Sequence, residues 1–175
     1  MITGITQVVG AIEASQFINC TMIALLGGIF AAILTGIGSA KGVKLVGSVA
    51  VGTLSEKPEL FGKLVILQAL PGTQGIYGLL VWFFIMNFAG FFDGTAGSLT
   101  IMQGFLYFLA CLPMAIVGYI SAKDQARVAA DGVGLVAKHP GEQSKAIILS
   151  AMVETYAIFA LLVSVLSIIM ISSLA

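Results

Sequence analysis

Charged residues are scarce in this sequence. Only 9% of its 175 residues are Asp, Glu, Lys or Arg, whereas 59% are apolar, so the chain has too little charge to form a water-soluble surface. The stretches 14–40, 64–92 and 94–122 contain no charged residue, and 146–175 contains only Glu154. Each stretch exceeds the roughly 20 apolar residues that a helix needs to cross a bilayer. We therefore expect an all-α integral membrane protein with four transmembrane helices.

Three other features are missing from the sequence, and their absence further restricts the kind of membrane protein expected. The apolar runs lack the period-two alternation of a spanning β-barrel. No basic residue precedes Lys41, so the start lacks the charged region of a secretory signal peptide, and we expect the first helix to be retained. Cys20 and Cys111 have no second cysteine at metal-binding or redox spacing, which predicts buried and inert thiols.

The basic residues are confined to two groups that flank the first and third interhelical connections. They are Lys41, Lys44, Lys57 and Lys63, and then Lys123, Arg127, Lys138 and Lys145. Because cytoplasmic loops carry an excess of Lys and Arg, these two connections are expected in the cytoplasm of a multi-pass cell-membrane protein. Both termini and the connection around Asp93 then lie outside. This asymmetry indicates membrane orientation and gives no reason to expect a nucleic-acid partner.

The second half of the chain repeats the first at an offset of 82 residues. Matching positions include Gly36 with Gly118, Ser39-Ala40-Lys41 with Ser121-Ala122-Lys123, and Pro58 with Pro140. We therefore expect two tandem helical hairpins. The predicted units are an outer N-terminal segment at 1–21, a first hairpin repeat at 22–97 and a second hairpin repeat at 98–175 that carries the carboxylate of Glu154.

The two hairpins point the same way by their charges, which argues against transporters built from inverted repeats. At the same offset Gly72 matches Glu154 and Val43 matches Gln125, so each pair of hairpins is expected to form one polar site. The first helix is rich in glycine, which permits close backbone contact between membrane helices. We expect this helix to be an inner, tightly packed one.

The position of Glu154 within the membrane requires an explanation, because burying a carboxylate there costs at least ~2.5 kcal/mol. Gln125 and Glu154 each lie 14 or 15 residues from the turn at His139-Pro140. Both therefore sit about 20 Å along their helices at ~1.5 Å per residue, and they can face each other. The alternative is a protonated or paired glutamate that only fixes helix packing.

The matching level of the second helix carries a Pro-Gly-Thr-Gln run. Thr73, Gln74 and Tyr77 share one side of this helix, and Pro71 with Gly72 can free a main-chain carbonyl. Together with Gln125 and Glu154 these groups can form an oxygen cage of single negative charge, which suits a hard monovalent cation. Taken singly, Thr and Gln can equally be interhelical contacts, and Tyr77 can either donate to Glu154 or sit at a helix contact.

Three segments together resemble the rotor-ring proteolipid subunit of V-type ATPases. They are Gly-Ile-Gly-Ser-Ala-Lys-Gly at 36–42, Leu-Pro-Gly-Thr-Gln-Gly-Ile-Tyr-Gly at 70–78 and Ala-Met-Val-Glu-Thr-Tyr-Ala at 151–157. The Pro-Gly-Thr-Gln run with Gln125 is similar to that of the bacterial sodium-translocating members. The resemblance implies sodium bound by Glu154, Gln125, Thr73, Gln74 and the Leu70 carbonyl, with Tyr77 hydrogen-bonded to the carboxylate. A proton-translocating proteolipid of the same ring type is the alternative.

The resemblance also implies a working assembly. Copies form a homo-oligomeric ring in lipid, turned by a soluble ATPase motor through its central-stalk subunits and moving past a static membrane subunit that carries a basic group. This chain is then expected to be non-catalytic, since ATP is hydrolysed on other subunits. Two other hypotheses remain open at this stage: a small multidrug exporter, and a structural or pore-forming proteolipid.

Overall fold

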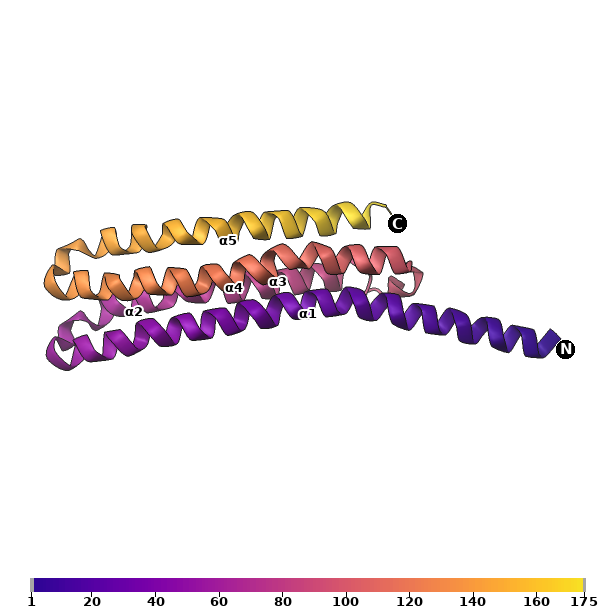
Figure 1. Ribbon diagram of the computed structural model, residues 1–175, viewed down its shortest axis with the longest axis horizontal. Coiled ribbons are helices and arrows are strands. Elements are labelled where there is room, and N and C mark those ends of the chain that lie inside the picture. Colours follow the sequence, from indigo (N-terminus) through magenta and orange to yellow (C-terminus); the bar gives the residue numbers. More distant parts are fainter. Residues whose placement is uncertain (1, 175) are drawn as a thin grey trace.

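The part of the chain that the structure describes is entirely helical apart from short connections. This computed structural model covers residues 2–174, with side chains described from Cys20 onward (Figure 1). The elements in chain order are α1 (Ile2–Glu56), η1 (Pro58–Leu60), α2 (Phe61–Ala69), η2 (Leu70–Gly72), α3 (Thr73–Phe88), η3 (Thr95–Ser98), α4 (Ile101–Lys138), η4 (Pro140–Glu142) and α5 (Gln143–Ser172).

Among the described residues, four segments are long and apolar enough to cross a membrane, which confirms the predicted number of spans. They are Cys20–Glu56, Pro58–Phe88, Ile101–Lys138 and Pro140–Ser172. The second span combines α2, η2 and α3, so it is broken at Pro71 as the sequence indicated. Helix α1 runs without a break through the expected boundary at residue 21, while the side chains of residues 1–19, including Glu13, lie outside the described part. The division into three units stays a prediction.

The helices lie side by side as two hairpins (Figure 1). The turns around Lys57 and His139 lie at one end of the bundle, whereas both termini and the connection between α3 and α4 lie at the other. Prolines begin both turns: Pro58 opens η1 and Pro140 opens η4. A proline at the first helical position forfeits no hydrogen bond there, because that N–H has no partner within the helix.

Helices α1 and α4 approach each other closely because one of them offers glycine at the contact. A Cβ atom at Gly38 would lie 2.9 Å from the carbonyl oxygen of Tyr119, and one at Gly42 would lie 2.9 Å from that of Ala122. Neither position leaves room for a side chain. The structure thus supports the expectation of tight packing for the first helix, through the small-residue contact typical of membrane helices.

The two hairpin turns are tied together by polar bonds at the end of the bundle. The Lys57 ammonium donates to the carbonyl of Ala137 at 2.6 Å, and the Lys63 ammonium donates to that of Pro140 at 2.6 Å. The Gln143 amide donates back to the carbonyl of Lys63 at 3.3 Å. The basic residues of the first turn therefore also hold the second turn in place.

The connection between α3 and α4 is built from local hydrogen bonds. Asp93 accepts from the backbone N–H of Thr95 at 3.0 Å and from its hydroxyl at 2.7 Å, and this holds the pKa of the exposed Asp93 carboxyl below its usual value. Gly90 and Gly94 adopt positive φ angles of 77° and 76°, which a residue with a side chain rarely takes. The structure therefore gives this connection a defined shape.

Candidate functional site

Buried polar residues form a layer across the middle of the bundle. Apolar clusters lie on both sides of it, one containing Met114 and Ile168 and the other containing Val46 and Leu67. The buried polar residues of this layer are Ser39, Gln74, Ser121, Gln125 and Ser150. Because an unsatisfied polar group in a dry interior is costly, this layer must satisfy its own hydrogen bonds.

The break in the second span supplies the first groups of the site. Pro71 has no N–H to donate, so the chain passes through the 3-10 helix η2 before α3 begins. The carbonyl of Leu70 accepts from the backbone N–H of Thr73 and, at 3.0 Å, from the Thr73 hydroxyl. The predicted main-chain carbonyl and the predicted hydroxyl therefore lie in direct contact.

Glu154 receives one donor on each carboxylate oxygen. The Tyr77 hydroxyl on α3 donates to Oε1 at 2.6 Å, and Gln125 Nε2 on α4 donates to Oε2 at 3.2 Å. Donors from two helices, α3 and α4, thus converge on the carboxylate of α5. The depth count from the His139 turn correctly placed Gln125 opposite Glu154, and of the two roles considered for Tyr77 the hydrogen bond to Glu154 is the one observed.

The two glutamines join the carboxylate to the η2 break. Gln74 and Gln125 are both 0% exposed, and Nε2 of Gln74 donates to Oε1 of Gln125. Oε1 of Gln74 accepts from the Thr73 hydroxyl at 3.3 Å. The chain of contacts therefore runs from Leu70 to Glu154 without interruption. All six residues predicted for the site lie in this one network.

Three serines also belong to the layer, although the sequence did not point to them as site residues. Ser121 donates to the carbonyl of Val153 at 3.2 Å, and Ser150 donates to the carbonyl of Gln125 at 3.3 Å. Ser39 accepts from the N–H of Gly75 at 2.8 Å, a group near the Pro71 break. The recurrence of Ser39 as Ser121 in the internal repeat was the available signal.

The chemistry of the layer suits a small hard cation. The six predicted site residues supply one carboxylate, two amides, two hydroxyls and one main-chain carbonyl, and an amide turned by 180° exchanges its nitrogen for its oxygen. Among the described residues there is no group of three or more His, Cys, Asp or Glu that could hold a metal ion. The single negative charge of Glu154 therefore matches one monovalent cation better than a divalent one.

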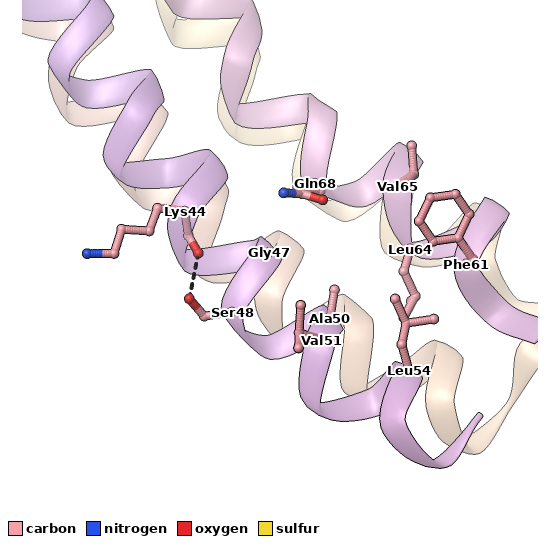
Figure 2. Close-up of a pocket in the computed structure, with 10 residues that line it drawn as sticks. All are labelled: Lys44, Gly47, Ser48, Ala50, Val51, Leu54, Phe61, Leu64, Val65 and Gln68. Carbon is pink, nitrogen blue, oxygen red and sulfur yellow. Dashed lines mark hydrogen bonds between the residues drawn. The ribbon is translucent and has the colours of Figure 1, made fainter. Parts of the chain in front are cut away.

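The equivalent level of the first hairpin has no such network. A Cβ atom at Gly72 would lie 3.8 Å from a methyl group of Val43, so an apolar pair stands where the second hairpin has Glu154 and Gln125. A cavity of about 360 Å³ lies nearer the turn, between α1 and α2 (Figure 2). Its lining includes Gly47, Ala50 and Leu64 but none of the six predicted site residues.

Comparison with known proteins identifies one matching family and two similar proteins. The family of the ATP synthase C subunit matches residues 26–85 and again 108–167, two segments separated by the same 82 positions as the internal repeat. The chain is 43% identical over 136 residues to the V-type sodium ATPase subunit K of Enterococcus hirae, a match that covers 78% of this chain and 83% of that protein. It is 37% identical over 144 residues to the A-type ATP synthase subunit K of Methanocaldococcus jannaschii, covering 81% and 60%.

Proposed function

The chain belongs to the family of the ATP synthase C subunit, and we propose that each copy carries one sodium ion on Glu154. As a rotor proteolipid of a V-type or A-type ATPase it is a multi-pass membrane protein with no catalytic role of its own. This membership sets aside the exporter and structural hypotheses. What remains to propose is the ion, the residues that hold it, the assembly and the orientation.

The observation that carries the sodium proposal is the network around the carboxylate. Proton carriage requires a carboxyl group and one hydrogen-bond partner, whereas a dehydrated sodium ion needs most of its hydration shell replaced by protein oxygens. Thr73, Gln74, Gln125 and the Leu70 carbonyl lie in one network with Glu154 and supply oxygens of that kind. The similarity to the sodium ATPase protein of Enterococcus hirae supports the same ion. A proton is the alternative cargo.

The proposed assembly is a homo-oligomeric ring embedded in lipid. The central stalk of the soluble ATPase motor turns the ring past a static membrane partner. A cation bound at Glu154 cancels the charge of the carboxylate, which lowers the cost of carrying it through the apolar part of the membrane. A basic group on the static partner then takes the place of the cation and releases it.

The proposed orientation places the two hairpin turns in the cytoplasm. All the Lys and Arg residues flank the turns around Lys57 and His139, which lie at one end of the bundle. Both termini and the connection between α3 and α4, which contains Asp93, lie at the opposite end, which is then outside. The excess of basic residues near cytoplasmic loops supports this choice.

Sodium-22 binding to the purified ring between pH 5 and 9 tests the ion and its ligands. Protons compete for the carboxylate, so binding should weaken as the pH falls. Gln125→Leu and Thr73→Val each remove a neutral ligand and should weaken binding at every pH.

Thr155→Val is the matched control, because Thr155 is the repeat equivalent of Thr73 and its hydroxyl bonds its own helix at the Met152 carbonyl. This variant should bind sodium as the unmodified protein does. If the unmodified ring binds no sodium at any pH in saturating salt, the cargo is the proton.

A further inference from the structure

A buried serine recurs at equivalent positions of α1 and α4, and in both hairpins it bonds the backbone of the second helix. Ser39 and Ser121 are 82 residues apart and are 7% and 5% exposed. The hydroxyl of Ser39 donates to the carbonyl of Gly72 at 3.5 Å, and that of Ser121 donates to the carbonyl of Val153 at 3.2 Å. Gly72 is the repeat equivalent of Glu154, and Val153 precedes Glu154. Both serines therefore lie at the level of the carboxylate.

The two hydroxyl oxygens accept from different donors. Ser39 accepts from the backbone N–H of Gly75 at 2.8 Å. Gly75 is the third residue of α3, and an N–H there has no acceptor within its own helix, because the break at Pro71 separates α3 from α2. Helix α5 is continuous from Gln143 to Ser172, so its backbone N–H groups at this level stay within the helix. The oxygen of Ser121 can therefore accept from a side chain.

That side chain is Gln74 on α3. Its Nε2 donates to Oγ of Ser121 at 3.5 Å and also to Oε1 of Gln125. An amide nitrogen carries two hydrogens, so these two acceptors use both. Oε1 of Gln74 points the other way and accepts from the Thr73 hydroxyl at 3.3 Å. Ser121 therefore faces the nitrogen end of the amide, and the oxygen end faces the predicted ligands of the η2 break.

Burial makes the orientation of this amide matter. Gln74 and Gln125 are both 0% exposed, so water cannot replace a lost hydrogen bond. If Gln74 turned by 180°, its oxygen would meet Oε1 of Gln125, and two acceptors would face each other without a hydrogen between them. Such an unpaired contact is costly in a buried site. The orientation of one amide therefore decides that of the other.

Both ends of this chain of side chains require the same orientation. At one end the Glu154 carboxylate can only accept, so Gln125 turns its nitrogen to Glu154 and its oxygen to Gln74. At the other end the single proton of the Ser121 hydroxyl goes to the Val153 carbonyl, and its oxygen then accepts from Gln74. The two ends differ in one respect. The hydrogen bonding of Glu154 changes when the carboxylate takes up a proton or a cation, whereas the Val153 carbonyl has no proton to gain.

We propose that Ser121 holds the Gln74 amide with its oxygen directed at the sodium ion, so that Ser121 strengthens sodium binding without touching the ion. Ser121 keeps this orientation whatever Glu154 carries. The oxygen is then in place before the ion arrives, which lowers the cost of ordering a ligand on binding. The inference rests on the proposed sodium site, for which it names a positioning residue.

Protection of Glu154 from a carbodiimide tests this role in the purified ring. The reagent modifies the protonated carboxyl, and bound sodium keeps the proton away, so the sodium concentration that gives half protection measures the affinity. Ser121→Ala should raise this concentration about fivefold, the effect of losing one hydrogen bond of ordinary strength. Sodium protection that is equal in the unmodified and Ser121→Ala rings would refute the role of Ser121 alone. A lack of sodium protection in the unmodified ring would instead refute the sodium assignment, and this inference with it.

The pH dependence of labelling separates positioning from loss of packing. Without sodium, the pH of half-maximal labelling reports the protonation of Glu154, whose carboxylate oxygens accept from Tyr77 and Gln125. Ser121 bonds neither oxygen, so Ser121→Ala should leave this pH unchanged while it weakens sodium protection. A shift of both quantities would show that the serine only supports the packing of the site, and it would overturn the proposal.

Ser164→Ala is the matched control. Ser164 is 0% exposed and also joins α4 to α5, where its oxygen accepts from the backbone N–H of Met114 at 3.2 Å. It lies ten residues beyond Glu154 along α5, or about 15 Å. The control therefore removes a buried hydroxyl from the same pair of helices and should leave sodium protection unchanged. Equal weakening in the two serine variants would overturn the proposal.

A double variant tests whether Ser121 acts through Gln74. Gln74→Met replaces the amide with an apolar side chain of similar length. If Ser121 works only by orienting that amide, Ser121→Ala should have no further effect on sodium protection in the Gln74→Met ring, and the two changes are not additive. A further loss of the same size as in the single variant would show that Ser121 affects the ion by another route.

Discussion

The Tyr77 hydroxyl makes the shortest contact with the Glu154 carboxylate, at 2.6 Å. Removing it with Tyr77→Phe deletes a hydrogen bond to a charged group, worth about 1.5 kcal/mol. We expect sodium binding to weaken by about tenfold, because about 1.4 kcal/mol corresponds to a factor of ten in Kd. Sodium-22 titration of the purified ring at one fixed alkaline pH measures this change.

Tyr156→Phe provides the control for this prediction. It also removes one tyrosine hydroxyl from a membrane helix, but the Tyr156 side chain is 66% exposed in the protomer and does not contact Glu154. Its sodium affinity should equal that of the unmodified protein. If Tyr77→Phe also leaves the affinity unchanged, Tyr77 has no part in holding the carboxylate for the ion.

The positions of single site residues could be predicted where the sequence fixes their depth in the membrane and their side-chain chemistry. Equal distances from one turn placed Gln125 at the level of Glu154, and the Pro-Gly pair marked the break beside Thr73. The serines of the layer were missed because a serine in a membrane helix commonly bonds its own backbone, as Ser48 does at Lys44. Only the packed structure shows that Ser121 and Ser150 bond elsewhere. The binding roles of the predicted ligands stay predictions.

At the scale of the helices, α1 and α4 depend on positions without side chains. Gly38→Ala would place a methyl group 2.9 Å from the Tyr119 carbonyl oxygen and force the helices apart. Overpacking of this kind costs about 1–3 kcal/mol. We expect the variant to unfold at a lower temperature, measured by the fluorescence of Trp82 in detergent.

Gly52→Ala on the same helix separates packing from helix propensity. A Cβ atom there meets nothing within 4 Å in the protomer, and alanine favours a helix over glycine by about 1 kcal/mol. The unfolding temperature of this variant should stay the same or rise. A fall of equal size in both variants would show that the close contact is not what Gly38 supplies.

The helices themselves followed from charge-free runs of membrane length, and their number is confirmed. Their ends were harder to predict. Helix α1 extends from Ile2 to Glu56, and the sequence has no proline before Pro58 to end it, although a separate outer segment was expected up to residue 21. Hydropathy shows where a helix can cross a membrane but does not show where the helix stops.

For the whole molecule, orientation in the membrane is the open prediction. Cysteines introduced singly at Pro58, Pro140 and Asp93 in a background without Cys20 and Cys111 report it. An impermeant thiol reagent should block the first two only from the cytoplasm and the third only from outside, because the basic residues hold the turns inside.

The structure already places the two turns at one end and the connection that contains Asp93 at the other, so the labelling has a built-in control. All three positions reacting from one side would contradict a bundle that spans the membrane. The reversed pattern would preserve the bundle and refute the orientation alone.

The internal repeat was visible in the sequence, and the family model matches residues 26–85 and 108–167, at the same offset of 82 residues. The sequence could not say which apolar faces meet protein, since lipid and protein select similar side chains. Leu67 and Leu149 are both leucines at equivalent positions of the repeat, yet Leu67 is 0% exposed and Leu149 is 60% exposed. That distinction needed coordinates.

In the proposed ring, Gly72, which stands where the second hairpin has Glu154, also sets the number of ions moved for each ATP. If Glu154 carries the ion as proposed, a ring of such copies has one ion-binding site for every four helices, half as many as a ring of the same helices with a carboxylate in each hairpin. The ATP molecules spent in one revolution then drive half as many ions, so the work available to each ion doubles. One charge crossing 100 mV requires about 2.3 kcal/mol. A small number of ions per ATP therefore favours building a steep ion gradient over moving many ions.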